Sequence, residues 1–271
     1  MTGFLISVPI ALTSYINSSA LEVYVNKYYV GIIYAIASIA TIIGMIRMPR
    51  ILTRFGNRFS TLLFCLIFLF SLIALGLGGR SFVVIPAFIL YFVSANLIFA
   101  SLDIFIEDFS KGSPIGGIRG VYLTIINFAW VISQMISGSI IAKSSLSGIY
   151  LLSALFMSLV CIIFSLFLRD FKDPQYEKVP ILGTIIFFLK NKDIAKIYFI
   201  TLILRFFYAW MIIYTPIYLR EYIGFDWSSI GIIFSIMLLP FIILELPLGR
   251  LSDKIGEKTM LTIGFLIISV S

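Results

Sequence analysis

Apolar runs of about twenty residues recur along almost the whole chain, and they constrain its fold more than any other feature. A bilayer core about 30 Å thick needs about twenty helical residues to cross it. Only 12% of the 271 residues are charged and 61% are hydrophobic, so a water-soluble fold could not cover its apolar surface. The sequence therefore predicts an all-α membrane protein. The predicted spans are residues 4–24, 30–48, 59–78, 82–102, 119–142, 148–168, 195–218, 229–248 and 259–271.

The two ends of the chain and one short run need separate interpretation. No basic segment precedes the first run, so we interpret it as a transmembrane helix and not as a cleaved signal peptide. The last run is still apolar at Ser271, so we expect the chain to stop inside a helix. Val179–Leu189 would reach only about 16 Å as a helix, and we predict that it lies in the cytoplasmic interface.

The distribution of basic residues predicts the orientation. With the amino terminus inside, the cytoplasmic segments hold 15 of the 20 Lys and Arg residues, the outer loops hold 4, and Arg205 alone lies within a span. Positive residues are retained on the cytoplasmic side, so we predict a multi-pass protein of the plasma membrane with a cytoplasmic amino terminus. The net charge of +7 then reflects topology, and no nucleic-acid partner is expected.

The residue types present exclude several kinds of site. The chain has no histidine, and Cys65 and Cys161 both lie in apolar runs. A Cys/His zinc site is thereby excluded and a disulfide framework is disfavoured. We expect no metal, no other cofactor and no catalytic residues.

The sequence repeats itself at an offset of 200 residues. Gly31–Ile36 returns as Gly231–Ile236, and further along the same helices an arginine, a glycine and a second basic residue also return. The repeated positions are Arg50, Gly56 and Arg58 in the first copy and Arg250, Gly256 and Lys258 in the second. Parallel repeats of this kind are a transporter architecture.

The second copy carries a recognisable motif. Gly249-Arg250-Leu251-Ser252-Asp253-Lys254-Ile255-Gly256-Glu257-Lys258 resembles the G-x-L-x-D-R-x-G-R-K loop signature of the major facilitator superfamily. The first copy, Pro49–Arg58, departs from it because Pro49 replaces the glycine and Thr53 the aspartate.

The resemblance implies nine of twelve helices in parallel pseudo-repeats, truncated at the carboxyl end. It divides the chain into an amino-terminal six-helix half (1–168), a cytoplasmic linker with an interfacial helix (169–194) and a partial carboxyl-terminal half of three helices (195–271). We expect residues 1–271 alone not to transport, because helix ten of that pattern is absent.

The resemblance also implies a cytoplasmic latch between the halves, formed by the charges of the repeated loops. Gly256 permits a tight reversal, and Asp253 offers a carboxylate at a helix terminus, where an anion near a helix N-terminus is stabilised. Arg50 and Arg54 could instead pair with Asp103 or Glu107, which stand four apart on one helix face. The alternative is that all of these charges are solvated. The candidate latch residues are Gly249, Arg250, Asp253, Lys254, Gly256, Lys258, Arg50, Arg54, Gly56, Asp103 and Glu107.

Arg205 is the most informative single residue for a substrate site. An arginine near mid-bilayer costs at least about 2.5 kcal/mol on insertion scales, and such residues face a cavity or a partner. Arg205 could therefore contact an anionic group of a substrate or form a gating ion pair. The alternative is a buried salt bridge or hydrogen bonds to backbone carbonyls. Tyr208 shares its helix face.

Polar side chains in other spans give further candidates. Asn127, Trp130 and Gln134 lie on one face of their helix, and amides in lipid need partners, so this face lines a cavity or bonds to a neighbouring helix. The resemblance places the central path along helices one, four, seven and ten, which favours Asn17, Asn96 and Arg205. The predicted substrate-binding residues are Arg205, Asn17, Asn96, Tyr208, Asn127 and Gln134.

These features favour a secondary transporter that moves a small-molecule substrate by alternating access, with a proton or sodium as a coupling ion. A membrane receptor or scaffold with the same fold is one alternative. A membrane enzyme acting on a lipid-linked substrate is another, although it would need acid–base, nucleophilic or metal groups. The antiporter motif of the superfamily is absent from helix five, where only Gly138 stands near its place.

Overall fold

The computed structural model describes residues 2–109, 115–143, 145–167 and 181–270, and these ranges are almost entirely helical. Six of the described helices are long and apolar enough to cross a membrane, and α3 contains two of the predicted spans. The prediction of an all-α, multi-span membrane bundle is therefore confirmed. The helices are α1 (Thr2–Ser14), α2 (Asn17–Glu22), α3 (Lys27–Leu77), α4 (Ser81–Phe109), α5 (Ile115–Lys143), α6 (Leu146–Phe167), α7 (Ile181–Lys190), α8 (Lys192–Tyr218), the π-helix η1 (Leu219–Ile223), α9 (Trp227–Ile255) and α10 (Glu257–Val270).

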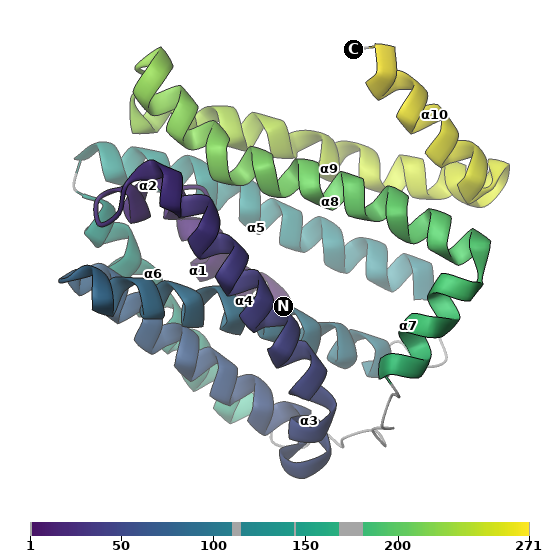
Figure 1. The fold of residues 1–271 in the computed structure, drawn as a ribbon, viewed down its shortest axis with the longest axis horizontal. Helices are drawn as coiled ribbons and strands as arrows, with labels where there is room; N and C mark the ends of the chain where they lie inside the picture. Colours follow the sequence, from purple (N-terminus) through teal and green to yellow (C-terminus); the bar gives the residue numbers. More distant parts are fainter. Residues whose placement is uncertain (1, 110–114, 144, 168–180, 271) are drawn as a thin grey trace.

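The helices pack as one bundle in which early and late segments meet. α3 packs against α4 and α6, and α1 packs against α5 and α6. Segments before residue 168 also meet segments after residue 195, because α5 lies along α9 and α2 lies against α8. Figure 1 places the α2–α3 and η1–α9 joins at one end of the bundle, and α7 and the α9–α10 turn at the other.

The first predicted span is not one helix. α1 ends at Ser14, Tyr15 and Ile16 form a turn, and α2 begins at Asn17. The hydroxyl of Thr13 donates to the carbonyl of Ile10 at 3.3 Å and that of Ser14 to the carbonyl of Ala11 at 3.0 Å. Such side-chain bonds compete with the helical ladder, so a cluster of short polar residues ends the helix that hydrophobicity alone predicts to continue.

The predicted loop between the second and third spans is also different. α3 remains helical through Pro49 and changes direction only at Gly56, whose φ of 75° and ψ of 163° are not helical. This backbone region is accessible essentially to glycine alone. The residues before Gly56 favour a helix. The helix therefore continues through the segment predicted as a loop, and only a kink at Gly56 interrupts it.

The short run before the seventh predicted span forms the helix α7, which agrees with the predicted helix at Val179–Leu189. Residues 179 and 180 lie outside the described ranges. Asn191 separates α7 from α8, and its side chain accepts a hydrogen bond from the backbone N–H of Ile194 at 3.3 Å. Asn191 therefore acts as the N-cap of α8.

Asp226 caps the start of α9, and its contribution to stability is expected to depend on pH. Its carboxylate accepts a hydrogen bond from the hydroxyl of Ser229 and one from the backbone N–H of Ser228 at 3.2 Å. The Ser229 hydroxyl and the backbone N–H groups of Ser228 and Ser229 hold the pKa of Asp226 below its ordinary value of 3.8. A lowered folded-state pKa means that the stabilisation is complete above about pH 4 and is lost as the pH falls through the folded-state pKa.

We therefore expect Asp226→Ala to lower the melting temperature at neutral pH, and the difference from the parent to shrink in strong acid. Thermal unfolding of purified protein in detergent at both pH values measures this. Asp226→Asn is the matched control, because its amide oxygen accepts at every pH. A difference for Asp226→Ala that does not change with pH would contradict the capping role.

Candidate functional site

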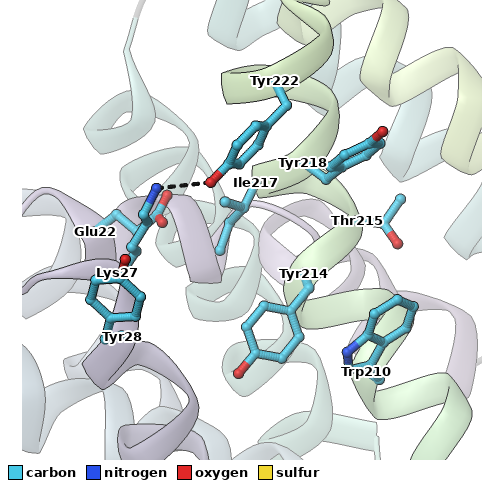
Figure 2. Close-up of a pocket in the computed structure, with 9 residues that line it drawn as sticks. All are labelled: Glu22, Lys27, Tyr28, Trp210, Tyr214, Thr215, Ile217, Tyr218 and Tyr222. Atoms are coloured by element: carbon cyan, nitrogen blue, oxygen red, sulfur yellow. Dashed lines mark hydrogen bonds between the residues drawn. The ribbon is translucent and has the colours of Figure 1, made fainter.

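A cavity of about 600 Å³ lies between the ends of α2 and α3 on one side and the end of α8 and η1 on the other (Figure 2). Small-molecule sites in proteins commonly measure about 300–1,000 Å³. The cavity is at the end of the bundle that the charge pattern predicts to face outward, and we call it the outer cavity. It is lined by Glu22, Lys27, Tyr28, Trp210, Tyr214, Thr215, Ile217, Tyr218 and Tyr222.

Lys27 joins the two sides of the outer cavity. Its ammonium lies 3.6 Å from a carboxylate oxygen of Glu221 and donates to the hydroxyl of Tyr222 at 3.0 Å. The same ammonium is 5.2 Å from the centre of the Tyr222 ring, within the range of a cation–π interaction. The Lys27 and Glu221 side chains are 40% and 42% exposed. An ion pair with that much solvent contributes little stability, so it can break and reform readily.

Glu22 stands in the cavity wall with one oxygen unsatisfied. Its Oε1 atom is buried and has no hydrogen-bond partner in the described part of the chain. The break in the first span begins the short helix α2, which carries Glu22 at its last residue. Within the described residues, no three His, Cys, Asp or Glu side chains are grouped to hold a metal ion.

Four aromatic residues line one side of the outer cavity at a spacing of four. Trp210, Tyr214, Tyr218 and Tyr222 follow α8 into η1, and residues four apart share a helix face. The ring centres of Trp210 and Tyr214 are 6.3 Å apart, and those of Tyr218 and Tyr222 are 5.8 Å apart and stacked. We call these four residues the aromatic ladder.

Gly31 and Gly231, one pair of glycines that the repeat aligns, lie where segments before residue 168 and after residue 195 meet. A Cβ atom on Gly31 would come within 2.4 Å of the Tyr214 hydroxyl oxygen. A Cβ atom on Gly231 would lie 2.7 Å from the backbone oxygen of Gln134 and 3.0 Å from the Cα atom of Gly138. Gly31 thus leaves room for the Tyr214 side chain of α8 against α3, and Gly231 allows α9 to approach α5.

Further contacts follow the α5–α9 crossing. The Ser235 hydroxyl of α9 donates to the carbonyl of Val131 in α5 at 3.0 Å. The ring of Tyr15, in the helix break, stacks on Phe234 of α9 with centres 5.3 Å apart. Small residues that let helix backbones approach, with hydrogen bonds across, are the usual means of helix association in lipid.

The structure does not bring Arg205 and Tyr208 to the outer cavity. Trp210 is the first residue of α8 that lines the cavity, and the Arg205 side chain is exposed. The ring of Tyr208 lies near Phe241 of α9, with centres 6.5 Å apart. A substrate role for either residue remains a prediction.

Asn17 lies in a buried hydrogen-bond network between α2, α4 and α6. Its amide donates to the Tyr91 hydroxyl at 3.2 Å, and the Tyr150 hydroxyl donates to its Oδ1 atom at 2.8 Å. Thr13 and Tyr91 share a further hydrogen bond of 2.7 Å. Asn17 is only 4% exposed, so in this structure it connects helices.

The other predicted amides also make local or interhelical contacts. Gln134 donates to the Ser14 hydroxyl at 2.7 Å, and Asn96 donates to the carbonyl of Phe92 in its own helix at 2.8 Å. Asn127 is half-buried. These contacts favour interhelical bonding for Gln134, and none of the three residues lines the outer cavity.

Removing the Asn17 amide should destabilise the bundle. Asn17→Ala would leave the buried Tyr91 and Tyr150 hydroxyls without this partner, at an expected cost of about 1–2 kcal/mol. Unfolding in detergent, followed by circular dichroism, measures the change. Asn96→Ala is the control, and it should cost less, since among the described residues Asn96 bonds to a carbonyl of its own helix. Equal losses for the two variants would argue against the network.

At the opposite end, the structure describes part of the candidate cytoplasmic latch. Arg50 and Arg54 are exposed, and the Arg54 guanidinium lies 5.1 Å from the centre of the Phe55 ring. Asp103 and Glu107 are both exposed, and their pairing with either arginine stays a prediction.

The backbone of the second loop is described. Gly256 has the positive φ, 87°, that a tight reversal requires. Asp253 belongs to the last turn of α9, and its role in a latch stays a prediction. Lys254 and Lys258 are exposed, whereas the side chains at Gly249, Arg250 and Asp253 lie outside the description.

Sequence reasoning missed the residues that line the outer cavity. Neither Glu22 nor Lys27 was among the predicted site residues. The available signal was the four-residue spacing of aromatic residues over 210–222. That signal is weak by itself, because aromatic residues are common in apolar helices.

Comparison with family models matches the whole chain, residues 1–271, to the model described as Major Facilitator Superfamily. A direct comparison with curated proteins gave no match. The family match agrees with the loop signature at Gly249–Lys258 and with the all-helical, multi-span fold.

Proposed function

The chain belongs to the major facilitator superfamily, and on that premise we propose that it is a secondary active transporter that moves a small solute by alternating access. Family membership makes it a membrane transporter of the major facilitator type. The observation that carries the finer proposal is the outer cavity, which lies between helices from the two sides of the repeat. A solute site between two homologous bundles is what a rocking carrier needs.

The contacts between the halves suggest how the cycle works. In this proposal, Lys27 with Glu221 and Tyr222 closes the outer end in one state and separates in the other. The Gly138–Gly231 crossing is the pivot in this proposal, because the backbones of α5 and α9 pack against each other there. The candidate cytoplasmic latch closes the inner end in the alternate state.

Several finer features belong to the same proposal. The halves are residues 1–168 and 195–271, joined by the linker 169–194. The protein lies in the plasma membrane with its amino terminus in the cytoplasm, and a proton or sodium ion couples to transport. Arg205, Asn17, Asn96, Tyr208, Asn127 and Gln134 remain proposed substrate-binding residues. None of these six residues lines the outer cavity, so in this proposal they would contact the solute in a state other than the one described.

Paired distance measurements in the full-length protein test the cycle. With Cys65 and Cys161 replaced by serine, spin labels at Val23 and Phe225 report on the outer end, and labels at Arg54 and Lys258 on the inner end. We expect two distances at each end, with opposite responses to a transported solute, because opening one side closes the other. One unchanging distance at both ends across a solute library would refute alternating access.

A charge swap tests the outer contact in the same experiment. Glu221→Lys places a second ammonium beside Lys27, and we expect it to raise the outward-open population by up to about fivefold, since an exposed pair is worth up to about 1 kcal/mol. The double variant Lys27→Glu/Glu221→Lys restores opposite charges and should restore the parental populations. Failure of the double variant to do so would remove the ion pair from the proposed gate.

A further inference from the structure

One carboxylate, Glu22, and one ammonium, Lys27, are among the residues that line the outer cavity. Glu221 is not part of this lining and lies beside Lys27. Lys27 is already engaged by Glu221 and Tyr222. Glu22 is left with a buried oxygen that no described group bonds, so the cavity has an acceptor without a donor.

The opposite wall of the outer cavity is suited to cations. Figure 2 shows Tyr222 facing Lys27, with the other rings of the aromatic ladder following along α8. The ladder spans 12 residues, or about 18 Å of helix. Aromatic faces attract cations, and the Lys27 ammonium over Tyr222 is a resident example of such a contact.

We propose that the outer cavity binds a monovalent organic cation with an aromatic or apolar body. The cationic group would lie beside Glu22 and offset the negative charge of its carboxylate, which Lys27 does not pair with. The apolar body would stack along the aromatic ladder. A volume of about 600 Å³ suits a molecule of this kind, whereas an anion would meet Glu22 and find only an ammonium that is already paired. This inference rests on the proposed function, because it names the class of solute.

Two probes of equal shape and opposite charge test the proposal. Tetraphenylphosphonium and tetraphenylborate each carry four phenyl rings around one central atom. They therefore share a shape, and the sign of their charge is what distinguishes them. Their binding to the full-length protein in nanodiscs is measured by equilibrium dialysis, with empty nanodiscs subtracted. We expect saturable binding of the cation, and saturable binding of the anion at least tenfold weaker.

Variants locate the binding in the outer cavity. Glu22→Gln should weaken cation binding about tenfold or more, because it removes a charge-assisted contact. Trp210→Ala should weaken it about threefold or more, and Trp210→Phe less. The matched controls are Asp193→Asn, an exposed carboxylate, and Phe206→Ala, an exposed ring on the same helix. Melting temperatures show that each variant is folded.

Each outcome bears on the inference. Preferred binding of tetraphenylborate, or cation binding that Glu22→Gln leaves intact, would overturn the cation site. Absence of cation binding would also overturn it. If the spin-label distances still exchange in that case, the transporter proposal stands and only the solute class fails. Loss of both binding and exchange would reject the two together.

Discussion

Replacing either Gly138 or Gly231 by alanine should cost about 1–3 kcal/mol of stability, the usual effect of overpacking a close contact. The added Cβ atom at Gly138 would lie 2.4 Å from the backbone oxygen of Trp227, and the one at Gly231 would lie 2.7 Å from that of Gln134. Backbone atoms cannot rotate away as a flexible side chain can. The methyl group must therefore push α5 and α9 apart, which also stretches the bond from Ser235 to the carbonyl of Val131.

Unfolding in detergent measures this loss, and Gly44→Ala is the matched control. Gly44 also lies within a helix of the bundle, but its new Cβ atom would meet only side-chain atoms of Val93 and Leu97 at 3.4 Å or more. In the control, the higher helix propensity of alanine, worth up to about 1 kcal/mol, is free to act. Gly44→Ala should therefore be neutral or stabilising.

A double variant tests whether the two glycines form one contact. Once Gly138→Ala has separated the helices, Gly231→Ala should add much less than its own cost, since neighbouring sites are not additive. The outer spin-label pair should also show a broader distance distribution, because the halves lose their pivot. Additive losses with an unchanged distribution would mean that the two glycines act separately and do not hold the halves together.

Much of the fold was predictable because lipid imposes simple rules. Span length and the scarcity of charge led to the all-α bundle, and the short run after residue 178 led to α7. The repeat identified Gly31 and Gly231 before their contacts were visible. Periodic hydrophobicity is a property of the chain itself, and a bilayer leaves few structures that satisfy the backbone.

The candidate site was less predictable, because it depends on which helices meet. Thr13 and Ser14 break the first span through local hydroxyl bonds, and no hydropathy average detects that. The break places Glu22 in the wall of the outer cavity. Because α2 packs against α8, the aromatic ladder lines the same cavity. Asn17 was favoured because the resemblance places helix one along the central path, yet its amide bonds to tyrosines of two other helices. Whether a polar residue lines the cavity or bonds to a neighbouring helix depends on which distant segments pack together.

Gly256→Ala should be the second large effect, and its cause should be backbone conformation alone. Gly256 joins α9 to α10 with a φ of 87°, and a Cβ atom there would meet no atom within 4 Å. A residue with a side chain in such a conformation costs about 1–3 kcal/mol. Gly264 provides the matched control, because a Cβ atom there is equally free of neighbours, but it lies inside α10 with no positive φ.

Gly264→Ala should therefore stabilise α10 by up to about 1 kcal/mol through helix propensity, so the two variants should differ by about 1–4 kcal/mol. α10 packs mainly on α9, and the strain is expected to appear first as local opening of this pair. Hydrogen exchange of the α10 amides should accelerate in Gly256→Ala and slow in Gly264→Ala. Equal exchange in both variants would show that the reversal at Gly256 does not need glycine. The positive φ at Gly56 and Gly256 would then not explain why the repeat has a glycine at both positions.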